Sequence, residues 1–294
     1  VVMIVALTII VIVGTVQAGG LSAVIDNAKA IPGFFDFFGI ATPTTVDGVQ
    51  QVVNGQPQFG AAGSYGFITI LSTLAWGLGY FGMPQVLLRF MAIRSEHELA
   101  RSRRIATGWV FISLVVAVFI GVVGRTLFPT ALTTSSTSEN VFILLSTNLL
   151  PPILAGFVMA GILAATISSS DSYLLIAASA LAKNIYQGLF RKDASDKQVM
   201  TVSRITLLAV AIVAMIIALD ENSVIFTIVS FAWAGFGAAF GPLVLLSLFW
   251  KRTTYPGAIA GMLAGGAMVF FWKLVMKPLG GVFAIYELLP AFVF

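Results

Sequence analysis

The sequence predicts an all-α membrane protein with about seven membrane-spanning helices. The 294 residues have a mean hydropathy of +1.00, 59% of them are apolar, and only 10% are charged. A soluble domain carries roughly 25% charged residues, so this chain could not cover a water-facing surface with polar groups. Its apolar residues form continuous runs, whereas a β-barrel would show alternating segments of about ten residues. Composition and patterning therefore exclude both a soluble globule and a disordered chain.

Seven apolar runs are long enough to cross the hydrocarbon core, which requires about 20 residues in a helix. They cover residues 1–17, 64–90, 105–127, 152–183, 201–219, 224–249 and 256–276. A final apolar segment, Val282–Phe294, is too short to cross. One helical bundle uses the whole length, so we expect a single transmembrane domain over residues 1–294 that begins and ends inside a longer protein.

Basic residues predict the direction of these spans, because Lys and Arg concentrate in cytoplasmic loops. Twelve of the 16 lie in every second loop: Arg89, Arg94, Arg101, Arg103, Arg104, Lys183, Arg191, Lys192, Lys197, Arg204, Lys251 and Arg252. The first span is then expected to run from the inside to the outside. The net charge of +4 suits contact with anionic lipid head groups. Nucleic acid is not an expected partner, since it would require a clustered basic face.

The two longest outer connections carry weaker signals. In the first, Leu21–Ile31 is expected to form a short interfacial helix with Asp26 and Lys29 turned to water. The remainder of this connection is long and rich in Gly, Pro, Thr and Gln, which favours a lid. The second, near Thr133–Asn140, is a Ser/Thr tract that leads into a helix, with Ser138 as its expected cap.

The second span contains the signals of a broken helix. Between Ala75 and Pro84 it carries three glycines followed by the proline. Gly costs about 1 kcal/mol and Pro about 3 kcal/mol in a helix interior, so we expect unwound backbone in mid-membrane. Trp76 and Tyr80, one turn apart, would then lie across the break and wall a pocket for a small solute. The alternative is a kinked helix packed closely on a neighbour through its glycines.

The fourth span carries neutral oxygen atoms on one face. Ala165, Ser168 and Ser169 stand at positions i, i+3 and i+4, so a backbone carbonyl and two hydroxyls converge there. Such a set suits Na⁺, whereas clustered carboxylates would indicate Ca²⁺. The alternative is that the hydroxyls only bond to the carbonyl one turn earlier or to a neighbouring helix.

Two further features are candidates for coupling or gating. Asp171, followed by Ser172, is the one acid well inside a predicted span, and an intramembrane acid is a functional candidate by default. In the sixth span, Gly235 and Phe236 belong to a run of small and aromatic residues ending at Pro242, which permits either bending or close packing.

Enzymatic chemistry is not expected. The chain has no Cys and a single His, which excludes a Cys nucleophile and a His-based zinc site. We find no catalytic triad, phosphate loop or dinucleotide fingerprint in the cytoplasmic loops.

Three segments together resemble the sodium:solute symporter family, and within it the bacterial symporters that carry proline. They are Trp76–Pro84 with its continuation Arg89–Ala92, the run Ala164–Leu175, and the block Phe231–Pro242. The resemblance extends over nearly the whole chain. It implies a LeuT-type fold of two inverted five-helix repeats, with the binding site at the midplane. The chain would then begin at the last helix of the first repeat and hold the whole second repeat.

The resemblance also implies roles for individual residues. It makes Trp76, Tyr80 and Pro84 the candidates for substrate binding, and it makes the Ala165 carbonyl and the hydroxyls of Ser168 and Ser169 the candidates for Na⁺ binding. Ser169 stands where some relatives have Thr, and Met83 stands where relatives often have Gln.

The implied function is sodium-coupled import of L-proline by alternating access across the bacterial inner membrane. The missing first-repeat helices would supply the other half of the sodium site, so we expect the chain alone not to transport. Two alternatives are a sodium symporter for another small solute, such as pantothenate, and a transporter-like sensor domain of a signalling protein.

Overall fold

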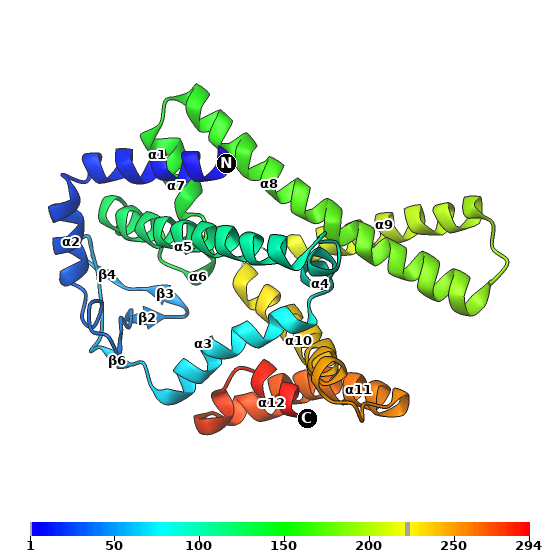
Figure 1. The fold of residues 1–294 in the computed structure, drawn as a ribbon. Helices are drawn as coiled ribbons and strands as arrows, with labels where there is room; N and C mark the ends of the chain where they lie inside the picture. Colours follow the sequence, from blue (N-terminus) through cyan, green and yellow to red (C-terminus); the bar gives the residue numbers. More distant parts are fainter. Residues whose placement is uncertain (1, 221–223) are drawn as a thin grey trace.

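The structure is a computed structural model that describes residues 2–220 and 224–294, so the first residue of the first predicted span lies outside the described part. Helices dominate it (Figure 1). The α-helices are α1 (Val2–Gln17), α2 (Leu21–Lys29), α3 (Phe67–Gly79), α4 (Pro84–Met91), α5 (Glu96–Leu127), α6 (Ser135–Ser138), α7 (Val141–Leu149), α8 (Pro152–Ser179), α9 (Asp196–Ala218), α10 (Ile225–Phe249), α11 (Tyr255–Phe271) and α12 (Leu288–Val293).

Shorter helical turns extend or join these helices. Two are π-helical, η2 (Ala180–Phe190) after α8 and η3 (Trp272–Met276) after α11; three are 3₁₀ turns, η1 (Tyr80–Gly82), η4 (Lys277–Leu279) and η5 (Gly281–Ala284).

The long helices confirm the predicted membrane class. Within the described residues, five helices are long and apolar enough to cross a membrane: Glu96–Leu127, Pro152–Phe190, Asp196–Ala218, Ile225–Phe249 and Tyr255–Leu279. The count rises to seven if two bent pairs are each one span. α1 and α2 meet at 82°, and Phe67–Gly82 meets α4 at 55°. Most of the apolar side chains on these helices remain exposed, as expected for surfaces that face lipid.

The helices pack in two groups (Figure 1). In the first, α1, α5, α7 and α8 surround the buried side chains of Ile10, Ile120 and Leu145. In the second, α3, α10, α11 and α12 surround Ala234 and Leu288, neither of which is exposed. α8 and α9 extend side by side from the first group as an antiparallel pair.

The first outer connection is folded, which the sequence interpretation did not anticipate. It holds three antiparallel strand pairs: β1 (Gly39–Ile40) with β6 (Gly63–Ser64), β2 (Thr45–Val46) with β3 (Val49–Gln50), and β4 (Val52–Val53) with β5 (Gln56–Pro57). Asp47 and Asn54, each followed by glycine, have positive φ in the two tight turns. Asp-Gly and Asn-Gly are the strongest short hairpin signals, so these hairpins were readable from the sequence.

Two smaller predictions concern the outer connections: a short helix near Leu21 and a helix cap at Ser138. A helix is present at α2, and Asp26 and Lys29 form an exposed ion pair on it at 3.4 Å, while its place at the membrane interface stays a prediction. The expected cap at Ser138 is wrong. Thr134 caps α6 through a reciprocal pair of hydrogen bonds with Thr137, while the Ser138 hydroxyl donates to the Ser135 carbonyl at 2.8 Å.

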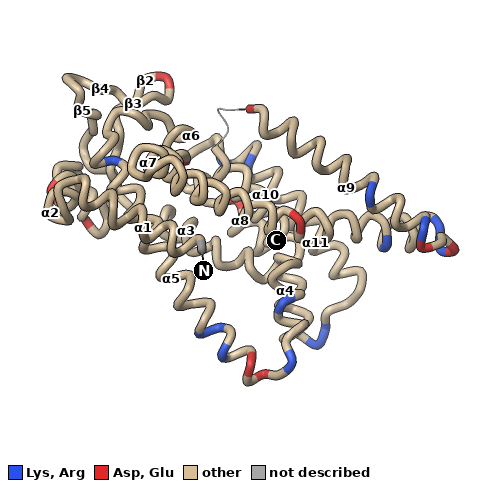
Figure 2. Tube along the Cα trace, turned by 90° about the horizontal axis from the view of Figure 1, so that it is seen from above, with Lys and Arg blue, Asp and Glu red and all other residues tan. Residues whose placement is uncertain are grey.

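Lys and Arg gather in two of the connections that the loop pattern marks as basic (Figure 2). Figure 2 shows Lys and Arg gathered at the connection between α4 and α5 and around the end of η2 and the start of α9. The predicted orientation in a bilayer remains a prediction that follows from this distribution.

Candidate functional site

The predicted break in the second span is present, but it lies later than expected. α3 continues through Gly77 and Gly79 into the 3₁₀ turn η1, and the helix ends at Met83, whose φ and ψ of −83° and 113° are extended. Pro84 then occupies the first position of α4, where its missing N–H costs no hydrogen bond. The glycines themselves therefore stay helical, and only Met83 is unwound.

Two of the three glycines of this segment, Gly79 and Gly82, allow close packing against α10. A Cβ on Gly79 would collide with the indole of Trp233, and one on Gly82 would collide with the Phe236 carbonyl. On α10, a Cβ on Gly237 would come within 2.8 Å of the Gly79 Cα. The alternative interpretation of close helix packing is thus confirmed for these glycines, alongside the break.

Trp76 belongs to a stacked aromatic cluster. Its ring lies 5.3 Å from that of Trp233, 5.5 Å from that of Phe226 and 6.1 Å from that of Tyr286, all within 16° of parallel. The Trp233 indole N–H also donates to the Trp76 carbonyl at 3.0 Å. Tyr80 meets Trp233 edge-on at 4.8 Å and leaves half of its surface exposed. Trp76 and Tyr80 therefore share the N-terminal side of the break, and the expectation that they lie across it is wrong.

The gating candidates on α10 lie beside this break. The Phe236 ring is 46% exposed and stacks on Phe240 at 6.2 Å, while the space that a side chain on Gly235 would occupy is open. Pro242 sits inside α10 without ending the helix. The structure thus brings Phe236 next to the substrate candidates through its contact with Gly82.

The sodium candidates lie on α8, which is unbroken there. Ala165, Ser168 and Ser169 are all exposed, and within the described part of the chain neither of the two serine hydroxyls is hydrogen-bonded. The neighbouring hydroxyls behave differently: Thr166 donates to the Ile162 carbonyl at 3.0 Å, and Ser172 donates to the Ser168 carbonyl at 3.4 Å. Hydrogen bonds to the carbonyl one turn earlier therefore occupy the hydroxyls of Thr166 and Ser172. The hydroxyls of Ser168 and Ser169 make no such bond and can bind a ligand.

Ala165 and Thr166 also line a cavity of about 510 Å³ between α1, α7 and α8. Its walls are apolar apart from a few groups, including the carboxylate of Glu139. Asp171 is exposed on α8, two residues beyond Ser169, and makes no ion pair with another described residue. The structure does not bring the two candidate sites together, because the sodium candidates lie in the first helix group and the substrate candidates in the second.

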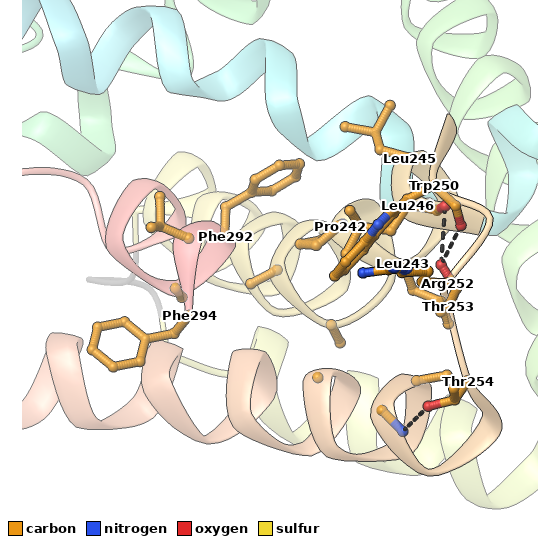
Figure 3. Close-up of a pocket in the computed structure, with 17 residues that line it drawn as sticks. Pro242, Leu243, Leu245, Leu246, Trp250, Arg252, Thr253, Thr254, Phe292 and Phe294 are labelled. Carbon is orange, nitrogen blue, oxygen red and sulfur yellow. Dashed lines mark hydrogen bonds between the residues drawn. The ribbon is translucent and has the colours of Figure 1, made fainter. Parts of the chain in front are cut away.

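A second cavity of about 510 Å³ lies between α10, α11 and α12 (Figure 3). Trp250 and Arg252 are at one end of it, and Phe292 and Phe294 are at the other. The Thr253 hydroxyl closes the turn by donating to the carbonyls of Leu246 and Trp250 at 3.1 and 2.9 Å. None of the sequence candidates lines this cavity.

Sequence reasoning missed a buried charge near the substrate candidates. Glu287, just before α12, is 1% exposed and forms ion pairs with Lys273 and Lys277 at 3.3 and 2.8 Å. Burial by itself would raise the pKa of Glu287, but the hydrogen bond from Lys277 and the positive charges of both lysines outweigh it and lower the pKa. An acid within the apolar segment Val282–Phe294 was the signal that could have found it.

Polytopic helical bundles with broken spans are common among secondary transporters. The family model described as the sodium:solute symporter family matches residues 1–265. The chain belongs to this family, whose members are symporters and not enzymes.

Curated relatives give the likeness in detail. The chain is 46% identical over 223 residues to the high-affinity proline transporter PutP of Bacillus subtilis, covering 76% of this chain and 46% of that protein. It is 45% identical over 229 residues to a sodium/proline symporter of Haemophilus influenzae and 41% identical over 232 residues to one of Escherichia coli. These matches cover 76% and 78% of this chain and 45% of each relative, so the chain spans about half the length of the curated relatives it matches.

Proposed function

We propose that this chain forms one half of a sodium-coupled symporter that imports L-proline across the bacterial inner membrane by alternating access. The observation that carries the proposal is the identity of 41–46% to relatives named for proline, over about three quarters of the chain. The broken span beside exposed aromatic groups supports it, because transporters of this kind bind solutes where helices are interrupted.

In this proposal, Trp76, Tyr80 and Pro84 form the chain's contribution to the proline site. Tyr80 offers an exposed ring and hydroxyl, and Pro84 begins α4 directly after the extended Met83. Trp76 contributes through the packing that holds Tyr80 in place, since its own ring is stacked on neighbours.

The proposed sodium site uses the Ala165 carbonyl and the hydroxyls of Ser168 and Ser169. A carbonyl oxygen has two lone pairs, so it can accept the helical hydrogen bond and still coordinate an ion. The remaining ligands would come from the first-repeat helices of the relatives' longer chains. Sodium and proline then favour the same conformation, so each increases the affinity for the other by the same factor.

In the coupling part of the proposal, Asp171 and Ser172 follow the sodium site on α8, while Gly235 and Phe236 adjoin the broken span. A movement of α10 at Phe236 would be transmitted to Gly82, because their backbones are in contact.

A chimera tests the function without depending on where this chain begins or ends. Residues 1–294 replace the matching half of the Bacillus subtilis transporter, and labelled proline uptake is measured in bacteria that lack proline transport. We expect uptake with Na⁺ and little uptake when choline replaces Na⁺. A well-expressed chimera that imports no proline, or that imports it equally without Na⁺, would contradict the proposal. Sodium-dependent uptake of pantothenate by a chimera that does not import proline would favour the alternative, a sodium symporter for another small solute.

A further inference from the structure

The segment that follows α11 docks between three helices near the substrate candidates. Glu287 holds the end of this segment to η3 and η4 at its start, since its buried carboxylate contacts Lys273 through Oε1 and Lys277 through Oε2. Removing one partner of a buried ion pair leaves an uncompensated charge, which makes the paired arrangement strongly preferred. The ion pairs therefore fix the position of the preceding residue, Tyr286.

Tyr286 links two helices that are distant in sequence. Its backbone N–H donates to the Ser72 hydroxyl on α3 at 2.9 Å, and its phenolic O–H donates to the Ser230 carbonyl on α10 at 2.5 Å. Its side chain is 9% exposed, so both contacts are shielded from solvent. Tyr286 thus holds α3 against α10 from a third element.

Tyr286 also contacts α3, the helix that leads to the break in the second span. Ser72 and Trp76 are one turn apart on α3, and the Tyr286 ring stacks on the Trp76 ring at 6.1 Å. The Trp233 indole N–H on α10 also donates to the Trp76 carbonyl. Trp76 is therefore held between Tyr286 and α10, and the next turn of α3 leads to Tyr80.

We propose that Tyr286, anchored by the ion pairs of Glu287, is a positioning residue for the solute site, which fixes Trp76 and the end of α3 before the break. The proposal deepens the proposed function and rests on it. Tyr286 does not contact the solute in this proposal. It acts by presenting the half-exposed Tyr80 in one orientation.

Tyr286→Phe tests this role, because it keeps the stacked ring and deletes the hydrogen bond to the Ser230 carbonyl. In the chimera, we expect the KM for proline to rise about three- to tenfold with little change in maximal rate per transporter, the range of one lost hydrogen bond. Trp272→Phe is the matched control. It deletes the Trp272 bond to the Phe283 carbonyl at 3.2 Å in the same docked segment and is expected to leave KM unchanged. An unchanged KM for Tyr286→Phe, or an equal rise in the control, would overturn the proposal.

A second measurement needs no transport and separates this proposal from the proposed function. The chain has no Cys, and the space around Gly77, one residue after Trp76, is open, so Gly77→Cys is a specific probe of this turn. We expect Tyr286→Phe to change the rate of maleimide labelling at this position at least twofold and Trp272→Phe to leave it unchanged. Equal rates in all three backgrounds would overturn the positioning role even if proline transport is established. Loss of proline uptake in the parent chimera would instead contradict the proposed function.

Discussion

At the scale of single residues, the hydroxyls of α8 share one chemistry but differ in their surroundings. The Thr166 hydroxyl donates to the Ile162 carbonyl, whereas the hydroxyls of Ser168 and Ser169 make no hydrogen bond to another described residue. We expect Ser168→Ala and Ser169→Ala each to raise the Na⁺ concentration for half-maximal uptake by the chimera roughly tenfold or more, as for a lost charged contact. Thr166→Ala, the matched control, should leave it unchanged. An identical sodium dependence in all variants would remove Ser168 and Ser169 from the site.

The glycines of the second span also differ residue by residue. Gly82 abuts the Phe236 backbone, which cannot move aside as a flexible side chain could, while the space at Gly77 is open. Gly82→Ala is expected to destabilise the protein by about 1–3 kcal/mol through overpacking. Gly77→Ala should be neutral or slightly stabilising, since Ala is the better helix former. Thermal unfolding in detergent measures both, and equal stability of the two variants would show that the contact is not tight.

At the scale of elements, the start of α10 is held by a residue from the other helix group. The Glu139 carboxylate accepts hydrogen bonds from the backbone N–H groups of Ile225 and Phe226 at 3.1 and 3.2 Å. These groups have no partner within the helix, and a negative charge there is favourable.

We expect Glu139→Gln to lower the stability by about 0.5–2 kcal/mol, the usual worth of a helix cap. The control is Asp26→Asn, which breaks an exposed ion pair with Lys29 and should cost almost nothing. Thermal unfolding of the two variants compares them, and a larger loss for Asp26→Asn would contradict the capping role.

Local patterns in the sequence predicted some of the structural elements and not others. Long apolar runs and the proline predicted the spans and the existence of a break, because both depend on local propensity and on the bilayer. The break falls at Met83 because the residue before a proline is biased toward extended backbone. The packing of Gly79 and Gly82 against α10 is a contact that no local pattern reports. The hairpins at Asp47 and Asn54 were signalled locally but were overlooked.

At the scale of the whole molecule, the distribution of Lys and Arg predicts which ends of the helices face the cytoplasm. The chain has no Cys, so single introduced cysteines report the topology cleanly. In intact cells that express this chain, a membrane-impermeant maleimide is expected to label Thr44→Cys in the first outer connection. Arg103→Cys, on the basic start of α5, should react only after the membrane is permeabilised. The reverse pattern would invert the orientation.

The sequence by itself determined the class of the protein, the long apolar runs and the residues that carry the family resemblance. The class and the apolar runs follow from composition and from hydropathy along the chain, which are local properties, and the resemblance follows from the matching residues themselves. Only the tertiary structure decided that the Trp76 ring stacks on the Tyr286 ring, and that Glu287 pairs with Lys277 beside it. Those outcomes depend on contacts between residues up to 214 positions apart, and pairing over such distances is fixed by packing and not by local sequence.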